Sequence, residues 1–228
     1  LLEFRKKNKT FHNLSFPTIS GAGPNSAIIH YKADKKTNRL LRKGDVYLVD
    51  SGGQYFYGTT DVTRTLSLGV HNFRIKNIFT RVLKGHIAVA SFKLNKNSYG
   101  DKIDQSARKF LRDINLDYPH GTGHGVGYFS NVHEGPQGIS RGNKVKFREG
   151  MITSNEPGYY KKNHFGIRIE NLVYVKKTRN KLKFEDLTLV PIDKTLIEKK
   201  LLTSFEKYWL NKYHQRVFIY LKRFMNKF

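Results

Sequence analysis

The stretch "LVDSGGQYFYGTTDVTRT", residues 48–65, carries two acidic residues in segments that otherwise have the character of strands. Asp50 ends an apolar run at 46–49, and Asp61 opens a second strand-like run. The turn residues 57–60 predict a hairpin between them, in which facing side chains lie about 5 Å apart. Two ionised carboxylates that close repel each other unless a proton or a cation lies between them. Taken alone, however, a strand-end cap for Asp50 and a turn role for Asp61 are the simpler explanations.

Two further acids occupy similar positions. Glu156 directly follows an apolar strand-like segment, and Glu170 lies inside another. Within that second segment Ile167 and Ile169 share one face, so Arg168 and Glu170 share the other. A charged pair inside a strand is costly unless it points at something polar. The alternative is a local salt bridge on an exposed face.

The histidines cluster in a glycine-rich stretch. "HGTGHGVG", residues 120–127, places His120 and His124 among four glycines, and His133 follows shortly after. Glycines allow another part of the chain to approach the backbone closely. The isolated histidines are expected to be ordinary core or surface groups; they are His71, His86, His164 and His214.

Four strand-borne carboxylates and a clustered imidazole together predict a metal site. Oxygen-rich ligand sets with some nitrogen suit hard or borderline divalent ions such as Mn²⁺. A formal charge of about −4 would be matched by two divalent cations, and a pair about 3.5 Å apart makes hydroxide from a shared water at neutral pH. Rigid strands are suitable for carrying metal ligands, because ligands must be held to within about 0.5 Å.

The periodicity of apolar residues predicts the remaining elements. Helices are expected from Phe73 onward and from about Asp101 onward, where apolar residues recur with the helical period. Strands are expected at 27–31, 45–55, 61–68, 151–160 and 165–175, the end of a polar helix at 1–12, and an amphipathic helix carrying Phe205, Trp209 and Val217 after the apolar segment 187–192. Helices and strands mix without βαβ regularity, so the predicted fold class is α+β.

Length and composition limit the class of protein. The 228 residues, 38% of them hydrophobic, suffice for one domain with a sizeable core. There is neither a run of about 18 apolar residues to span a membrane nor a secretory h-region. The absence of cysteine excludes disulfides, Cys-ligated zinc and thiol nucleophiles, and it fits a cytoplasmic protein. The first residue is Leu1 rather than Met, so we expect a fragment of a longer chain.

The chain is strongly basic. It has 42 Lys and Arg against 18 Asp and Glu, a net charge of +24. Such a charge is typical of proteins that bind nucleic acid or anionic surfaces. The lysines are nevertheless scattered, and no basic motif interleaved with aromatic residues emerges. Residues with A/T-rich codons are abundant throughout, so compositional drift is the favoured explanation and nucleic acid is not expected to be a partner.

At this point the sequence resembles the Xaa-Pro aminopeptidases (aminopeptidase P) of the metallopeptidase family with the pita-bread fold. The matching stretches are "LSFPTISGAGPNSAIIHY" (14–31), "VYLVDSGGQYFYGTTDVTRT" (46–65), "VLKGHIAVA" (82–90), "LDYPHGTGHGVGYFSNVHEGP" (116–136), "SNEPGYY" (154–160), "FGIRIEN" (165–171) and "LTLVPID" (187–193). The resemblance implies a catalytic domain at 1–182 and a C-terminal extension packed on it at 183–228. Long members carry upstream domains that cap the site and help dimerisation, so these are expected to be missing here.

The resemblance also implies a ligand set. Asp50 would chelate one metal ion, Asp61 and Glu170 would bridge both, and His124 and Glu156 would complete the second. Glu156 would in addition carry a proton to the leaving prolyl nitrogen. The cofactors would be two divalent ions, with Mn²⁺ preferred and Zn²⁺ or Co²⁺ as alternatives.

Other residues match positions around the substrate. His30 and His133 match histidines beside the scissile carbonyl, and His120 matches one that lines the pocket for proline. Arg168 matches an arginine thought to relay protons, and Tyr160 matches a tyrosine near the site.

The function implied by the resemblance is removal of an N-terminal residue that precedes proline, and the partners would be peptides with proline at position two. A homodimer is a further implication. The alternatives are a prolidase, which cleaves dipeptides only, and a non-catalytic pita-bread module that binds nucleic acid or protein. The intact set of five ligand residues argues against the last of these.

Overall fold

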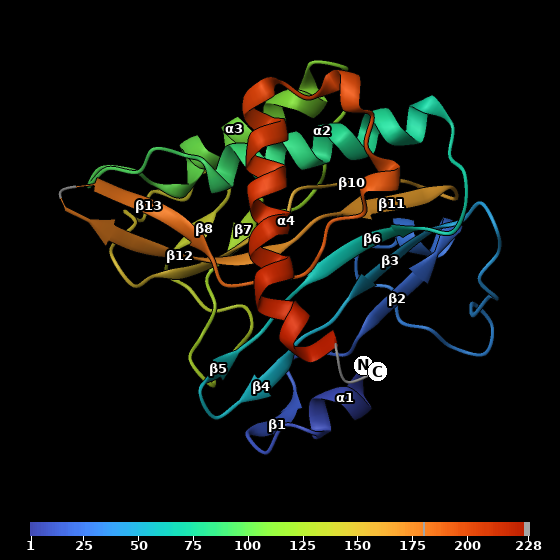
Figure 1. Cartoon of the computed structure of the whole chain (residues 1–228), viewed down its shortest axis with the longest axis horizontal. Helices are drawn as coiled ribbons and strands as arrows, with labels where there is room; N and C mark the ends of the chain where they lie inside the picture. The colour runs from blue at the N-terminus through green and yellow to red at the C-terminus, as the bar shows by residue number, and fades with distance from the viewer. Residues whose placement is uncertain (180, 226–228) are drawn as a thin grey trace.

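The computed structural model describes residues 1–179 and 181–225, which form a mixed array of helices and small antiparallel sheets (Figure 1). The helices are α1 (Leu2–Lys6), α2 (Phe73–Ala90), α3 (Gly100–Arg112) and α4 (Ser204–Met225). The strands are β1 (Phe11–Leu14), β2 (Ile19–Ala22), β3 (Val46–Asp50), β4 (Gly53–Tyr55), β5 (Gly58–Thr59), β6 (Thr63–Ser67), β7 (Gly123–His124), β8 (Gly138–Ile139), β9 (Ile152–Asn155), β10 (Gly158–Lys161), β11 (Phe165–Arg168), β12 (Asn171–Thr178) and β13 (Lys181–Asp186). None of the described helices is long and apolar enough to cross a membrane.

The small sheets pair strands that are far apart in the sequence. Strands pair in the orders β2–β3–β6 and β13–β12–β9, and β10 and β11 form a hairpin. The short pair β7–β8 lies beside β9, because Gly125 bridges to Thr153. Figure 1 shows α2 and α3 along one side of these sheets and α4 running across them.

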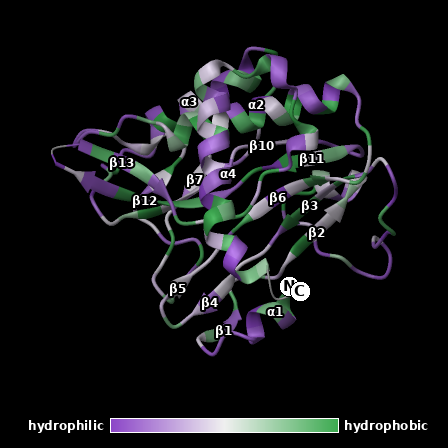
Figure 2. Ribbon diagram, viewed as in Figure 1, coloured by the Kyte–Doolittle hydropathy of each residue, from purple (hydrophilic) through white to green (hydrophobic). Residues whose placement is uncertain are grey.

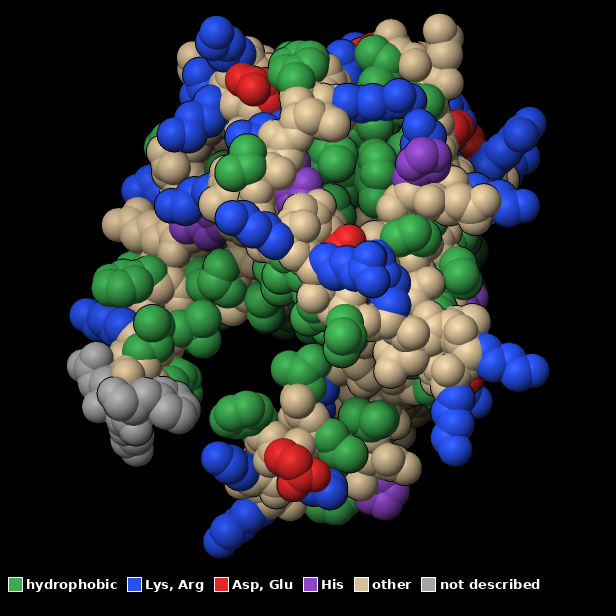
Figure 3. All heavy atoms as spheres, turned by 90° about the vertical axis from the view of Figure 1, so that its right-hand side faces the viewer, with side chains coloured by type: hydrophobic (Ala, Val, Ile, Leu, Met, Phe, Trp, Pro, Cys, Tyr) green, Lys and Arg blue, Asp and Glu red, His purple; other side chains and the backbone are tan. Residues whose placement is uncertain are grey.

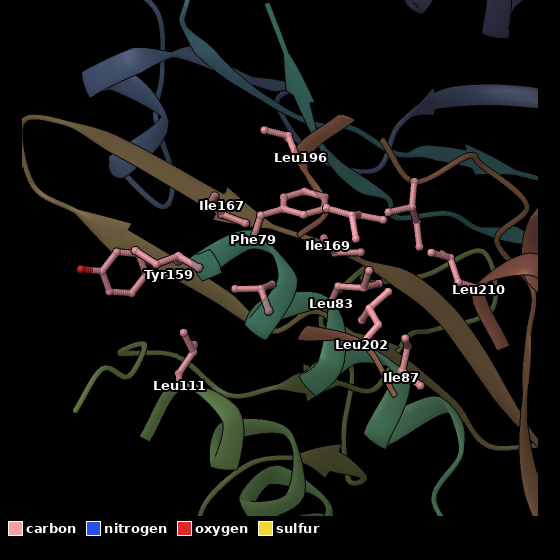
Figure 4. Close-up of a cluster of buried hydrophobic side chains, with 14 of the residues drawn as sticks. Phe79, Leu83, Ile87, Leu111, Tyr159, Ile167, Ile169, Leu196, Leu202 and Leu210 are labelled. Atoms are coloured by element: carbon pink, nitrogen blue, oxygen red, sulfur yellow. The ribbon is translucent and has the colours of Figure 1, made fainter. Parts of the chain in front are cut away.

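The main core lies between α2, the β10–β11 hairpin and α4. Phe79, Leu83 and Ile87 recur every four residues and therefore form one buried stripe of α2. Figure 4 shows this stripe facing Ile167 and Ile169, which are fully buried. Burying each such side chain stabilises the fold by about 1.5–3 kcal/mol. In Figure 2 hydrophobic and hydrophilic residues alternate along the helices, as expected of helices with one buried face.

Helix α4 contributes to the same core through Leu210, Tyr213 and Val217. The predicted inward residue Phe205 is instead 58% exposed. Its neighbour Glu206 turns inward, where Lys84 forms an ion pair with it at 2.6 Å. The division of the chain into parts at 1–182 and 183–228 stays a prediction.

Some expected elements are wrong. Residues 27–31 form no strand, because a 3-10 helix at Gly23–Ala27 runs into turns that leave Ile28 exposed. The N-terminal helix ends at Lys6, since the chain then enters β1 to pair with β4. The apolar segment 187–192 lies outside the helices and strands, and two of its backbone carbonyls accept hydrogen bonds from a buried arginine.

The expected hairpin that pairs Asp50 with Asp61 is also wrong. The small hairpin of β4 and β5 is inserted between them, so Asp50 pairs with Thr63 across β3 and β6. The strand expected at 165–175 breaks before Glu170, which lies between β11 and β12. Arg168 and Glu170 are only 2% and 1% exposed, which excludes a salt bridge on a solvent-facing strand.

The buried arginine is Arg64 of β6, and it links the C-terminal region to the centre of the molecule. Its guanidinium donates hydrogen bonds to the carbonyl oxygens of Val190 and Pro191 at 2.7 and 2.9 Å. It also donates to the backbone carbonyl of Glu170 and to the hydroxyl of Tyr213, the latter at 2.9 Å. Segment 187–192 and α4 are thereby tied to the strands that carry the acids.

Tyr213→Phe is expected to lower the free energy of unfolding by about 1–3 kcal/mol, because a buried charged donor loses one acceptor. The lost hydroxyl also donates to the carbonyl of Val190 at 2.8 Å. Tyr208→Phe is the matched control, since Tyr208 lies on the same helix and is 61% exposed. Urea unfolding of both variants checks the prediction, and equal effects would contradict it.

Candidate metal centre

The predicted ligands lie at strand ends that converge. Asp50 ends β3 and Asp61 precedes β6, while Glu156 follows β9 and Glu170 separates β11 from β12. His124 is in β7, next to β9. Five residues that are up to 120 positions apart in the chain therefore meet at one place on rigid backbone.

The residues form two overlapping clusters. The ligand atoms of Asp50, Asp61 and Glu170 all lie within 4.8 Å of one another, and so do those of His124, Glu156 and Glu170. Glu170 belongs to both clusters. Asp61 also groups with His124 and His133. The arrangement offers two adjacent positions for cations with a shared carboxylate between them.

Crowding and burial make the carboxylates costly to ionise. Burial raises the pKa of Asp61 well above its usual range, and the charges of Asp50 and Glu156 raise it further. The pKa of Glu170 is raised well above its usual range by burial and by the charge of Asp61. Cations among these groups would offset the repulsion and restore the ionised forms.

One carboxylate oxygen lacks a protein partner. Oδ2 of Asp50 accepts a hydrogen bond from Arg168 at 2.6 Å, but Oδ1 is buried without a partner among the described residues. Buried polar atoms are normally satisfied, so an atom of this kind points to a missing ligand. Asp50 belongs to the first cluster, so its unpartnered Oδ1 is available as a ligand atom there.

His124 is oriented as a metal-binding imidazole. Its Nδ1 lies 2.9 Å from the carbonyl oxygen of Gly125, which can only accept, so Nδ1 carries the hydrogen. Nε2 is left with a free lone pair and lies 3.5 Å from Asp61 and 3.3 Å from Glu156. A backbone acceptor that fixes the tautomer in this way is characteristic of histidine ligands.

Two hydroxyl residues that the sequence interpretation missed support the acids. Thr63 donates to Glu170 Oε2 at 2.8 Å, and Ser154 donates to Glu156 Oε1 at 3.0 Å. Thr63 lies two residues after Asp61, and Ser154 lies two before Glu156. Residues at that spacing share one face of an extended chain, so the pattern could have indicated both.

A hydrogen-bonded chain runs from Asp50 of the first cluster to His120. Arg168 binds Asp50 through one nitrogen and donates through another to the hydroxyl of Tyr160 at 2.7 Å. The Tyr160 hydroxyl lies 2.9 Å from His120 Nε2. Burial raises the pKa of Tyr160 to about 12 and lowers the pKa of His120, so Tyr160 donates to a neutral imidazole. The Nδ1 hydrogen of His120 goes to the carbonyl of Gly121 at 2.7 Å.

The predicted residues share one cleft of about 670 Å³. Its wall contains His30, Asp50, Asp61, His120, His124, His133, Glu156, Arg168 and Glu170. Tyr160 is not part of this wall, but its hydroxyl is hydrogen-bonded to two residues that are, His120 and Arg168. Apolar residues that were not predicted complete the wall; they include Phe16, Pro17, Ile19, Ile29, Pro119 and Val132.

Two histidines lie at the solvent-exposed side of the cleft. His30 and His133 are both exposed, and the ring of His133 lies 4.1 Å from that of His124, centroid to centroid. They can therefore reach a molecule bound at the clusters without being needed to hold the acids in place. Together these features define an α+β protein with a histidine–carboxylate centre of the kind that holds a pair of divalent cations.

Comparison with known proteins gives the family. The sequence model of metallopeptidase family M24 matches residues 1–177, and that of the C-terminal region of peptidase M24 matches residues 180–227. The chain belongs to metallopeptidase family M24. It is 50% identical over 222 residues to a probable Xaa-Pro aminopeptidase P of Laccaria bicolor and 48% identical over 227 residues to aminopeptidase P2 of Arabidopsis thaliana, matches that cover 92% and 95% of the chain. The chain spans about a third of the length of these curated relatives, 35% and 32%.

Solved structures agree with the fold. The X-prolyl aminopeptidase of Caenorhabditis elegans, described as a cytosolic enzyme with a di-nuclear active site, matches with a TM-score of 0.94 and 40% identity. The match covers 99% of this chain and 38% of that one. Prolidase from Pyrococcus furiosus matches with a TM-score of 0.67 and 28% identity, over 76% of this chain and 50% of that one. The predicted α+β class and pita-bread fold are confirmed.

Proposed function

We propose that the chain is the catalytic part of a metal-dependent aminopeptidase that removes an N-terminal residue preceding proline. The observation that carries this proposal is the pair of overlapping clusters that share Glu170 in one cleft. The names of the similar proteins, Xaa-Pro aminopeptidase P and X-prolyl aminopeptidase, support the substrate class.

The residues fit two divalent cations, and we assign the ligands accordingly. Asp50 would hold the first ion, His124 and Glu156 the second, and Asp61 and Glu170 both. Mn²⁺ suits a set of four carboxylates and one imidazole best, with Zn²⁺ and Co²⁺ as alternatives. When bound, such a pair of ions polarises a carbonyl group and supplies hydroxide at neutral pH.

The chain's own side chains would then assist the reaction. His133 and His30, at the open side of the cleft, would donate hydrogen bonds to the oxygen of the scissile carbonyl as negative charge develops on it. Glu156 would carry a proton to the leaving prolyl nitrogen. His120 would form part of the proline pocket with its apolar neighbours. Before cleavage the prolyl nitrogen bears no hydrogen, so the pocket needs no acceptor for it.

Substrate length tests this proposal against the prolidase alternative. With Mn²⁺ present, the chain is expected to release the first residue from a tripeptide that has proline at position two. It should leave the same tripeptide with alanine at position two largely uncut. Cleavage of the Xaa-Pro dipeptide but not of the tripeptide would support a prolidase, and cleavage of neither would contradict the proposal.

The charge of the chain provides the second test. On the face shown in Figure 3 the Lys and Arg side chains are spread around the molecule instead of forming one patch. Exposed lysines are solvated, and salt screens their field over about 8 Å at physiological strength. Excess RNA at about 0.15 M salt is therefore expected to leave hydrolysis of the tripeptide unchanged. Strong inhibition, or submicromolar sequence-selective binding, would instead favour the nucleic-acid-binding alternative.

Location and assembly are further parts of the proposal. The Caenorhabditis elegans relative is described as cytosolic, which supports a cytoplasmic location for this chain. A homodimer stays a prediction, and sedimentation of the chain checks it.

A further inference from the structure

His86 lies in the C-terminal half of α2 and is fully buried. Its Nδ1 is 3.1 Å from the carbonyl oxygen of Asn155 and 3.2 Å from that of Ile169. Carbonyl oxygens can only accept, so Nδ1 carries the hydrogen and shares it between the two. The other ring nitrogen, Nε2, has no hydrogen-bond partner in the described part of the chain. His86 is therefore a neutral single donor that contacts both strand β9 and the link between β11 and β12.

The two acceptors have a particular place in the chain. Asn155 immediately precedes Glu156, and Ile169 immediately precedes Glu170. One N–H group thus joins the two backbone points from which these carboxylates project. The contact is reciprocated, because the side-chain amide of Asn155 donates to the backbone carbonyl of His86 at 3.0 Å.

We propose that His86 is a positioning residue, which fixes the distance between Glu156 and Glu170 so that both reach the same cation with His124. This inference rests on the proposed metal centre. His86 is not part of the cleft wall and acts only through the backbone. Ligands must be held to within about 0.5 Å, and groups that hold ligands in place affect metal affinity by about 10–100-fold.

A role in packing alone explains the residue poorly. An imidazole with one unpartnered nitrogen is more costly to bury than an apolar side chain of similar size. Burial and, to a smaller extent, the nearby charge of Arg64 lower the pKa of His86 to about 3, so the ring stays neutral. A contact with the edge of Trp209, at 6.0 Å between ring centroids, could be made by any aromatic ring. Only a hydrogen-bond donor can bind the two carbonyl groups, so this bond is what distinguishes His86 from an apolar or aromatic side chain at the same position.

The test compares two substitutions of nearly the same shape. Asn places an amide donor close to the Nδ1 position, whereas Leu places a methyl group there. His86→Leu is expected to weaken the binding of one Mn²⁺ to the metal-free protein by about 10–100-fold, measured by titration calorimetry. His86→Asn should recover most of this loss. Leu is the better helix former, so weaker binding by the Leu variant cannot come from a weakened helix.

Ile87→Ala is the control for a purely structural effect. Ile87 is the next residue of α2, is 2% exposed, and packs in the main core. This variant should unfold at a lower urea concentration, because it leaves a cavity in the core, yet bind Mn²⁺ as the wild type does. If His86→Leu does not fold, His86→Gln replaces it, because the longer Gln amide lies near Nε2 and not near Nδ1.

Two results would overturn the inference. One is unchanged Mn²⁺ affinity in His86→Leu or its Gln substitute, and the other is equal loss of affinity in the Asn and Leu variants. Because the measured quantity is metal binding, the outcome is independent of the proposed peptidase activity. A wild-type chain that binds Mn²⁺ but cleaves no peptide would contradict the proposed function and leave this test intact.

Discussion

Glu170→Ala is expected to abolish peptide hydrolysis and to reduce the metal content of the protein from two ions to less than one. Glu170 is the residue that the two clusters share, so its loss removes a ligand from both positions. Glu170 is 1% exposed, and its Oε2 accepts a hydrogen bond from Thr63 at 2.8 Å, so the carboxylate is held in place between the two positions. Asp61→Ala should have the same effect if Asp61 also bridges both ions. Metal analysis and turnover of an Xaa-Pro tripeptide check both variants.

Loss of metal must be separated from loss of the fold. Glu149→Ala is the matched control, since this glutamate is exposed and lies outside the cleft. In the metal-free state, removing one crowded carboxylate relieves repulsion, so Glu170→Ala should melt no lower than the metal-free wild type. A Glu170→Ala or Asp61→Ala variant with two bound ions and normal turnover would refute the ligand assignment.

The sequence predicts the site better than the topology around it. The four acids lie at an end of a strand-like segment or inside one, and His124 lies in a glycine-rich stretch; an acid is conspicuous where burial is expected. Helices α2 and α3 were also predicted, because their apolar residues follow the helical period over several turns.

The pairing of the strands could not be predicted, because it depends on contacts between distant segments. Asp50 and Asp61 looked like facing residues of a hairpin, yet the hairpin of β4 and β5 lies between them, and β4 pairs with the distant strand β1. Phe205 was predicted to face inward on α4, but the neighbouring Glu206 faces inward instead, because it forms an ion pair with Lys84, 122 residues away. The spacing of apolar residues in the sequence cannot predict that an acidic residue is buried through an ion pair with a distant partner.

The roles of His86 and Arg64 were missed because they too depend on contacts between distant segments. His86 was interpreted as an ordinary core histidine, and its sequence surroundings show nothing else. Its partners are backbone carbonyls 69 and 83 positions away, and a backbone carbonyl has no signature in the sequence. Arg64 bonds likewise to carbonyls more than 100 positions away. Residues that act through the backbone become visible only in the folded chain.

His133→Ala is expected to lower turnover by about 10²–10³-fold while both metal ions stay bound. His133 is exposed at the open side of the cleft, where an imidazole N–H can reach the carbonyl oxygen of a bound peptide. A donor to that oxygen acts mainly in the transition state, so the loss should appear in kcat more than in KM. His120→Ala should also retain both ions, but it should raise KM, because His120 contributes to the proposed proline pocket.

The metal content of His133→Ala is the decisive measurement, because the structure leaves His133 close enough to bind a cation. Its ligand atom groups with those of Asp61 and His124 within 4.8 Å. If His133 is a ligand, the alanine variant loses an ion and excess Mn²⁺ restores activity. If His133 only stabilises the developing charge, the variant keeps two ions and excess metal restores nothing. Tyr160→Phe is the control for His120, since it removes the hydroxyl bonded to His120 Nε2 at 2.9 Å and leaves every proposed ligand in place.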